Sequence, residues 1–194
     1  MNHLAHLFLA GEDDDSLIGN IAGDFVKGPL ADRYTVEIRK GIQEHRRIDG
    51  FTDAHPSVGA FRRVLVPEHG HYARVIADVF FDHFLASRFE EYAGESLDAF
   101  LLRTFARLDA NLHRLPGALG VVYPLMRDQR WLQSYATIDG IHRALSGISR
   151  RLSRRPQLQL ATRHLVDSRD ELELHFRAFF PDVVAFANAI RSGA

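Results

Sequence analysis

The chain has 194 residues and a formal net charge of −1 at pH 7, and 46% of its residues are hydrophobic. This length suits one domain with its own core, and this composition excludes a disordered chain. The lack of cysteine excludes disulfide scaffolds, thiolate metal sites and cysteine nucleophiles. No apolar run approaches the roughly 18–20 residues that a membrane span needs, and the near-neutral charge does not favour general binding to nucleic acid.

The first ten residues are apolar, but they lack a basic region and run directly into an acidic stretch at 12–15. This pattern does not favour a secretory signal, so the cytoplasm is the expected location. Motifs of the form Gly-x-Ser-x-Gly and Gly-x-x-x-x-Gly-Lys are absent, so neither a serine hydrolase nor a P-loop enzyme is supported. The sequence leaves the oligomeric state open.

Apolar residues recur at helical spacing along nearly the whole chain, and no two-residue hairpin signal separates alternating runs. In chain order, the pattern predicts helices over 17–26, 36–49, 53–65 with Asp53 as its cap, 72–89, 97–112 with Ser96 as its cap, 118–135, 138–148, 158–179, and a short last helix restarted by Pro181. No repeat or linker divides the chain. We therefore predict an all-α fold, a single helical bundle over residues 1–194.

Potential oxygen and nitrogen ligands concentrate in the first half of the chain. His45 and Asp49 stand four residues apart on one predicted helix. Asp78 and Asp82 repeat that spacing on another helix, so each pair shares one helix face. Together with Asp24 from a third segment, the two pairs could surround a divalent ion inside a bundle. Without thiolates, carboxylates and imidazoles suit Mn²⁺, Fe²⁺, Mg²⁺ or Zn²⁺.

Each of these groups also has a purely structural interpretation. A His/Asp pair at this spacing is commonly a surface pair worth a few tenths of a kcal/mol, and Asp78 and Asp82 could lie on a solvent face. Their helix is otherwise strongly apolar, however, and two unpaired carboxylates on one face repel each other and are costly to bury. A cation would relieve both costs. His3 and His6 could be core or capping residues.

Arginine dominates the basic residues, and two groups of arginines stand out. Arg46 and Arg47 follow His45, so that one could hold a phosphate while the other faces water. The stretch 141–163 contains no acidic residue, and it is either a solvated helix end or a docking patch for an anionic partner such as an acidic protein. Interleaved aromatic residues are absent, which disfavours single-stranded nucleic acid. The docking candidates are Arg143, Arg150, Arg151, Arg154 and Arg155.

A series of motifs follows in a specific order over the first 90 residues. They are Asn2-x-Leu4-Ala5-His6-Leu7-x-Leu9-Ala10, Gly19-Asn20-x3-Asp24-Phe25-Val26-x-Gly28, His45-Arg46-Arg47-Ile48-Asp49, Thr52-Asp53 and Asp82-His83-Phe84-Leu85. In order and spacing these motifs resemble the acyl carrier protein phosphodiesterase family, and the resemblance covers essentially the whole chain. It implies a helical, HD-type phosphohydrolase that uses a divalent metal, with manganese preferred, to remove the 4′-phosphopantetheine arm from holo-acyl carrier protein.

The resemblance assigns roles to the candidate residues. The expected metal ligands, or residues directly supporting them, are Asp24, His45, Asp49, Asp78 and Asp82. His83 or His6 would orient water or protonate the departing serine oxygen, and Arg46 or Arg47 would hold the phosphate. The sequence departs from the usual HD order, because its adjacent pair reads Asp82-His83. Carrier proteins of this kind are small and acidic, so the arginine patch would be their docking surface.

Two other interpretations stay open. The chain could be an HD-type phosphohydrolase that acts on a nucleotide, since a high arginine content fits such a substrate as well. It could also be a helical module without enzymatic activity that docks acidic proteins through its basic helix. In that case the polar residues of the first half would be helix caps and surface pairs.

Overall fold

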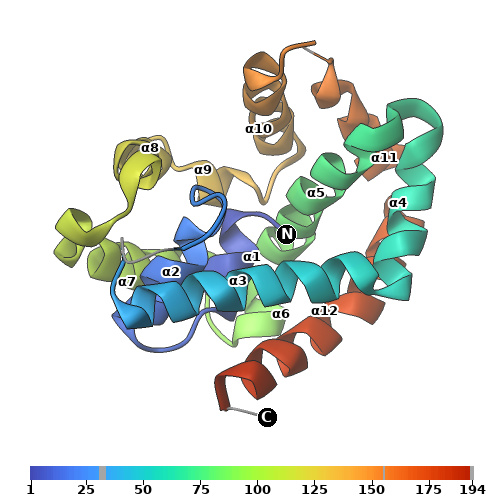
Figure 1. Cartoon of the computed structure of the whole chain (residues 1–194). Coiled ribbons are helices and arrows are strands. Elements are labelled where there is room, and N and C mark those ends of the chain that lie inside the picture. Colours follow the sequence, from blue (N-terminus) through green and yellow to red (C-terminus); the bar gives the residue numbers. More distant parts are fainter. Residues whose placement is uncertain (31–33, 155, 193–194) are drawn as a thin grey trace.

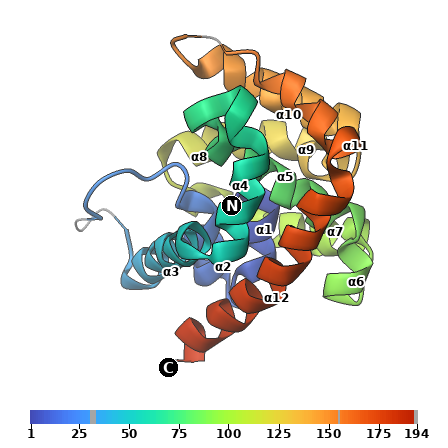
Figure 2. The ribbon, with the colours of Figure 1, turned by 90° about the vertical axis from the view of Figure 1, so that its right-hand side faces the viewer.

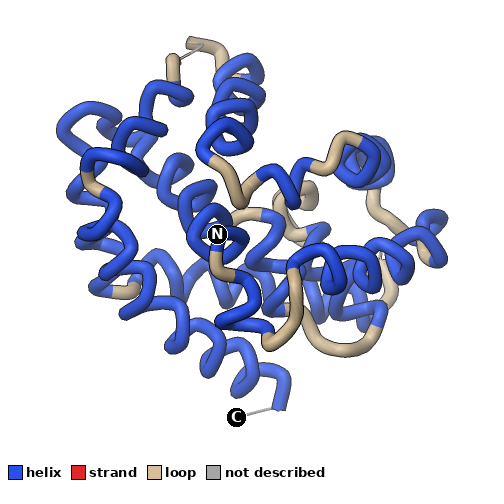
Figure 3. The backbone as a smooth tube through the Cα atoms, turned by 180° about the vertical axis from the view of Figure 1, so that it is seen from behind, coloured by secondary structure: helices blue, strands red, loops and turns tan. Residues whose placement is uncertain are grey.

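The computed structural model describes residues 1–30, 34–154 and 156–192. Over these residues the chain forms helices joined by loops and contains no β-strand (Figure 3), which confirms the all-α prediction. The helices in chain order are α1 (His3–Leu9), α2 (Asp14–Ala22), α3 (Val36–Ala54), α4 (Pro56–His69), η2 (Gly70–Tyr72), α5 (Ala73–Ser87), α6 (Phe89–Ala93), α7 (Leu97–Ala110), η3 (Leu112–Arg114), α8 (Gly117–Asp128), α9 (Trp131–Ser134), α10 (Ile138–Arg151), η4 (Leu158–Arg163), α11 (His164–Asp167) and α12 (Arg169–Ser192). None of these helices is long and apolar enough to cross a lipid bilayer.

Helix α5 is largely buried, because apolar residues occupy most of its circumference. It packs against α1, α4, α10 and α12 (Figure 1). Phe81 of α5 meets Phe61 of α4 edge-to-face with ring centroids 4.7 Å apart, and Phe84 stacks on Phe176 of α12 at 5.5 Å. Helix α12 crosses the near side of the molecule in Figure 2 and closes this aromatic core. The chain is therefore one helical domain.

Helices α2 and α3 approach each other closely because two glycines lie at their crossing. A Cβ atom added to Gly19 would lie 2.6 Å from the Cα of Gly41, so neither position has room for a side chain. This contact places the end of α2, which leads to Asp24, beside the middle of α3, which carries His45 and Asp49. The glycine pair thus sets the distance between two of the segments that carry predicted ligands.

The helix caps agree only in part with the prediction. Ser96 caps α7 as predicted. The predicted cap Asp53 is wrong, because α4 begins later and His55 caps it by accepting a hydrogen bond from the Ser57 amide at 3.2 Å. Asp53 instead accepts a hydrogen bond from the Arg62 guanidinium at 2.8 Å. The proline after His55 fixes the first turn of α4 and so moves its start downstream.

The C-terminal third differs from the prediction in two places. The predicted helix over 118–135 is interrupted after α8 by Arg130, which adopts a left-handed backbone with φ of 52°. The predicted helix over 158–179 is divided: its first part forms η4 and α11, and its second part belongs to α12. No new helix starts at Pro181, because α12 continues through it. The side chains of Phe180 and Val183 on either side of this proline are fully buried. Their burial offsets the hydrogen bond that a proline removes from a helix.

We expect Gly19→Ala to lower the free energy of unfolding by about 1–3 kcal/mol, because the added methyl group overpacks the α2–α3 crossing. Gly59→Ala in α4 is the matched control, since a Cβ there would meet only the Arg63 Nη1 atom at 3.7 Å. Urea unfolding of both variants measures the difference. Equal unfolding midpoints for the two variants would contradict the tight crossing.

Candidate metal centre

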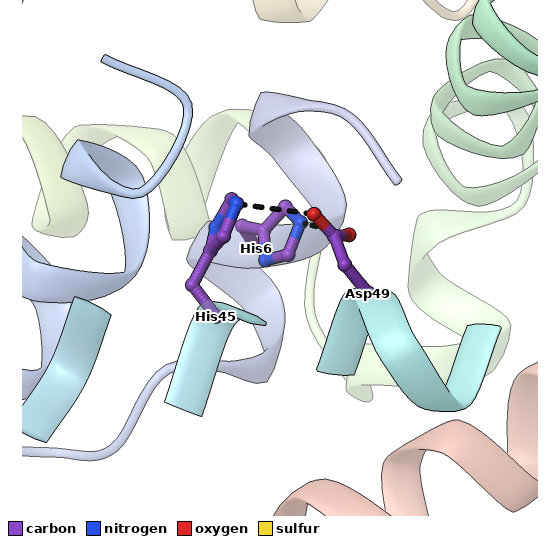
Figure 4. Close-up of side chains that lie close together, drawn as sticks. All are labelled: His6, His45 and Asp49. Carbon is purple, nitrogen blue, oxygen red and sulfur yellow. Dashed lines mark hydrogen bonds and ion pairs between the residues drawn. The ribbon is translucent and has the colours of Figure 1, made fainter. Parts of the chain in front are cut away.

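His6 of α1 and the pair His45 and Asp49 of α3 form a compact cluster. One ligand atom from each lies within 4.8 Å of the others. The Nε2 atoms of both histidines lie 3.2 Å from oxygens of the Asp49 carboxylate. Figure 4 shows the two imidazoles side by side, with the carboxylate directed toward both. The structure therefore brings together a pair that the spacing along α3 predicted and a histidine from a distant helix.

The orientation of both rings suits metal ligation. The Nδ1 atom of His45 lies 2.8 Å from the backbone oxygen of Asn20. Because a carbonyl only accepts, this contact places the proton on Nδ1 and leaves the Nε2 lone pair facing the carboxylates. The His6 and His45 rings stack with centroids 3.7 Å apart. Burial, together with repulsion from His45, lowers the pKa of His6 to about 4, so this ring is neutral at pH 7.

Asp24 borders the cluster from the segment that follows α2. Its Oδ1 atom lies 3.7 Å from Nε2 of His45, and its Oδ2 atom lies 3.0 Å from Nδ1 of His3. The preceding Gly23 is required here, since a Cβ would fall 2.2 Å from the His45 ring. The contact between His3 and Asp24 was not predicted, because nothing in the spacing of the two residues relates them.

Arg46 secures the same segment. Its Nη2 atom donates to the backbone oxygens of Gly28 at 2.8 Å and Val26 at 3.2 Å. The guanidinium is thus held against the loop that carries Asp24, and its predicted phosphate contact stays a prediction. Its neighbour Arg47 instead lies over the Phe186 ring, 5.9 Å from the centroid.

Negative charge accumulates around the two imidazoles. The Met1 ammonium lies 3.0 Å from Asp49 and 3.4 Å from Asp78, beside α5 in Figure 1. Burial alone would lower the pKa of this ammonium, but the two carboxylates raise it to about 10. Burial alone would raise the pKa of Asp49, but the neighbouring His45 and His6 side chains and the Met1 ammonium lower it overall. Asp49 is therefore ionised, and the site attracts cations.

Asp82 and His83 do not join the cluster. Both oxygens of Asp82 accept backbone N–H groups at the start of α1, from Leu4 at 2.8 Å and Ala5 at 3.0 Å. Burial raises the pKa of this carboxyl to about 7 although these N–H groups act to lower it. The Nδ1 atom of His83 lies 2.8 Å from the backbone oxygen of Tyr135. The structure thus gives no support to the ligand role predicted for Asp82 or the catalytic role predicted for His83.

The donor set fits a divalent cation. Neutral imidazole nitrogens and ionised carboxylates are ligands for Mn²⁺, Fe²⁺ and Zn²⁺. Both side-chain polar atoms of Asn20 are buried without a hydrogen-bond partner, as is Nδ1 of His6. Buried polar atoms without a partner, next to a cluster of charged groups, are typical of a site that an ion or a water molecule fills. His6, His45, Asp49 and the bordering Asp24 are the residues that would hold the ion.

A second group of potential ligands comprises Glu68, His69 and His164, at the junction of α4 with η4 and α11. Arg163 already forms an ion pair with Glu68. His6, His45 and Asp49 are the stronger candidate group, because both of its histidines are buried, whereas Glu68 in the second group is exposed.

The arginines predicted to dock a partner are exposed. Arg143, Arg150 and Arg151 lie on α10, and Arg154 follows it. Within residues 1–30, 34–154 and 156–192, none of these four forms an ion pair with a carboxylate. Arginines elsewhere, such as Arg107 with Asp14 at 2.8 Å, are paired. Arg155, also predicted to dock, lies outside the described residues.

We expect Mn²⁺ to raise the melting temperature of the unmodified protein, because an ion that binds only the folded state stabilises it. His45→Ala should remove most of that shift. Asp82→Ala should lower stability by at least about 2 kcal/mol, because two N–H groups of α1 lose their acceptor, but it should retain the shift at saturating Mn²⁺. Differential scanning calorimetry with and without Mn²⁺ measures all three. Loss of the shift in Asp82→Ala alone would instead make Asp82 a ligand.

Comparison with known proteins identifies the family. A family model described as acyl carrier protein phosphodiesterase matches residues 1–183. A protein of that name from Serratia proteamaculans is 34% identical over 188 residues, covering 95% of this chain and 96% of its own. One from Photorhabdus laumondii is 31% identical over 182 residues, covering 93% and 92%. No solved structure matches, so likeness to the HD fold stays a prediction. The chain belongs to the acyl carrier protein phosphodiesterase family.

Proposed function

We propose that this protein hydrolyses the phosphodiester that joins 4′-phosphopantetheine to a serine of holo-acyl carrier protein, giving apo-carrier and 4′-phosphopantetheine. Family membership and the names of the relatives support the reaction. The observation that carries it is the convergence of His6, His45 and Asp49. We propose Mn²⁺ as the metal, with Mg²⁺ or Fe²⁺ as alternatives. The whole chain, 1–194, would act as one phosphodiesterase domain in the cytoplasm.

The chemistry requires positive charge and an activated water beside an anionic ester. A divalent cation in this site would neutralise phosphoryl charge and favour ionisation of a water molecule. His6, His45 and Asp49 would hold the cation, and Asp24 could add a further carboxylate. Asp78 places a second carboxylate near Asp49, and the Met1 ammonium contacts both carboxylates. The Asn20 carbonyl holds the His45 ring in its ligating tautomer.

The leaving serine oxygen needs a proton, and the geometry favours His3 as its donor. Nδ1 of His3 lies against the Asp24 carboxylate at 3.0 Å, so the carboxylate orients the ring. His6 faces Asp49 inside the cluster. His83 contacts the Tyr135 carbonyl instead. We therefore propose His3 as the general acid and His83 as a residue that positions the turn at Tyr135.

The test is hydrolysis of purified holo-acyl carrier protein with Mn²⁺, followed by mass spectrometry of the carrier. We expect a mass loss equal to the prosthetic group. Asp49→Ala should lower kcat/KM on the order of a thousandfold, since the bound ion would lower the activation barrier by several kcal/mol. Asp98→Ala, which removes an exposed carboxylate paired with Arg130 at 3.1 Å, is the control and should keep full activity.

Other outcomes of that experiment separate the alternatives. Cleavage of ordinary nucleotides with the holo-carrier left intact would replace the proposal with a nucleotide phosphohydrolase. Binding of carrier protein without turnover and without metal would leave a helical docking module. Full activity of Asp49→Ala on the holo-carrier would remove the metal centre from the mechanism.

The same proposal makes the arginines of α10 the docking surface for the carrier. Arg143, Arg150, Arg151 and Arg154 are exposed and free of ion pairs within the described part of the chain, and we include Arg155 with them. An acidic carrier would gain attraction from these charges during encounter and binding. The attraction should weaken as salt is added, because exposed charges are screened beyond roughly 8–10 Å at physiological ionic strength.

We expect the double charge reversal Arg150→Glu/Arg151→Glu to raise KM for holo-carrier on the order of tenfold and to lower kcat much less. The matched control is Lys40→Glu/Arg63→Glu, which makes the same charge change at exposed positions of α3 and α4. Steady-state kinetics at low and high salt measure both variants. An equal loss at saturating carrier, or the same rise in KM in the control, would count against this docking surface.

A further inference from the structure

A cavity of about 810 Å³ opens beside the metal centre, between the N-terminal segment and α10. Asn2 and His3 form the end nearest the centre, and His3 is the residue that contacts Asp24 at 3.0 Å. Tyr135 forms part of the wall, and its phenol is hydrogen-bonded to the Asn2 side chain. The cavity therefore starts next to the position that a phosphate bound at the metal centre would occupy.

The walls of the cavity combine apolar, neutral polar and cationic groups. Trp131, Tyr135 and Ile148 supply apolar surface, and Gln129 and Ser134 supply hydrogen-bonding groups. Ser146 adds a hydroxyl, and the arginines that line the cavity all belong to α10. No carboxylate is among the described lining residues, so the cavity does not favour a cationic ligand. Its volume lies within the range of roughly 300–1,000 Å³ that is typical of sites for small organic ligands.

Two glycines shape this wall of the cavity. A Cβ at Gly140 would lie 1.8 Å from the backbone oxygen of Ser134, so α10 approaches the turn after α9 as closely as a backbone allows. A Cβ at Gly147 would meet only the Nη2 atom of Arg150, at 3.9 Å. Gly147 therefore leaves open space in the middle of α10, although glycine is a poor helix former.

We propose that this cavity holds the pantetheine arm of the substrate, an inference that rests on the proposed function. The arm is a chain with one dimethyl branch, two amides and a terminal thiol, which matches the apolar surface and the neutral hydrogen-bonding groups of the wall, and the arginines of the wall suit the anionic phosphate end of the ligand. Its phosphate end would lie at His3 and Asn2, beside the metal centre. Helix α10 then serves both halves of the substrate: Arg143, Arg150 and Arg151 border the arm cavity, and they are exposed enough to face the carrier as well.

Trp131 gives a direct measurement, because it is the only tryptophan in the chain and it lines the cavity. Titration of the protein with 4′-phosphopantetheine should produce a saturable change in tryptophan fluorescence, and titration with pantetheine should do the same at higher concentration. AMP should produce no such change at equal concentration. A response to AMP but not to 4′-phosphopantetheine, or no response to either pantetheine compound, would overturn the assignment.

Gly147→Leu tests the same cavity by filling it. The substitution replaces a helical glycine by a good helix former and meets little in the structure, so the variant should fold. It should weaken 4′-phosphopantetheine binding at least tenfold and raise KM for the holo-carrier. Gly59→Leu in α4 is the matched control, with only Arg63 Nη1 at 3.7 Å from the added Cβ, and it should bind like the unmodified protein.

The two proposals fail in different ways. If the unmodified protein does not release the arm from holo-carrier, the proposed function is wrong, whatever the fluorescence shows. If the unmodified protein releases the arm, but Gly147→Leu binds 4′-phosphopantetheine and turns over the carrier as well as Gly59→Leu does, the reaction stands and the arm cavity is wrong.

Discussion

Asp24 and Asp49 both lie beside Nε2 of His45, and Asp78 adjoins Asp49 through the Met1 ammonium that contacts both. Carboxylates held this close repel one another, and a cation bound among them would relieve that repulsion. The fold is arranged to keep them there. The glycines of α2 and α3 bring the two helices into backbone contact, the aromatic core fixes α5, and α5 in turn anchors the start of α1. A cation at this point lies next to a cavity and a basic helix, so that charge, cavity and docking surface adjoin one another.

Several features could be predicted because they depend on local spacing. The i, i+4 relation of His45 and Asp49 places both on one face of α3 regardless of the rest of the fold, and the structure confirms that they meet. The all-α class follows from the 3.6-residue period of apolar residues. Ser96 caps its helix because a side chain two or three residues from a free amide needs only local geometry to reach it.

Other features depend on tertiary contacts that spacing does not encode. Asp82 has the same spacing to Asp78 as Asp49 has to His45, yet the start of α1 approaches it from elsewhere in the chain and takes both its oxygens. His3 reaches Asp24 only because α1 lies against the end of α2. Pro181 stays within a helix because buried aromatic residues hold both sides of it. Each difference arises where packing between distant segments outweighs a local preference.

The central claim is that one divalent ion binds between α1 and α3, and crystals grown with Mn²⁺ test it most directly. An anomalous difference map recorded above the manganese absorption edge should show a peak within roughly 2.0–2.3 Å of Nε2 of His6, Nε2 of His45 and a carboxylate oxygen of Asp49. A peak at Glu68, His69 and His164 instead, or no peak in crystals of protein that is active with Mn²⁺, would contradict the account.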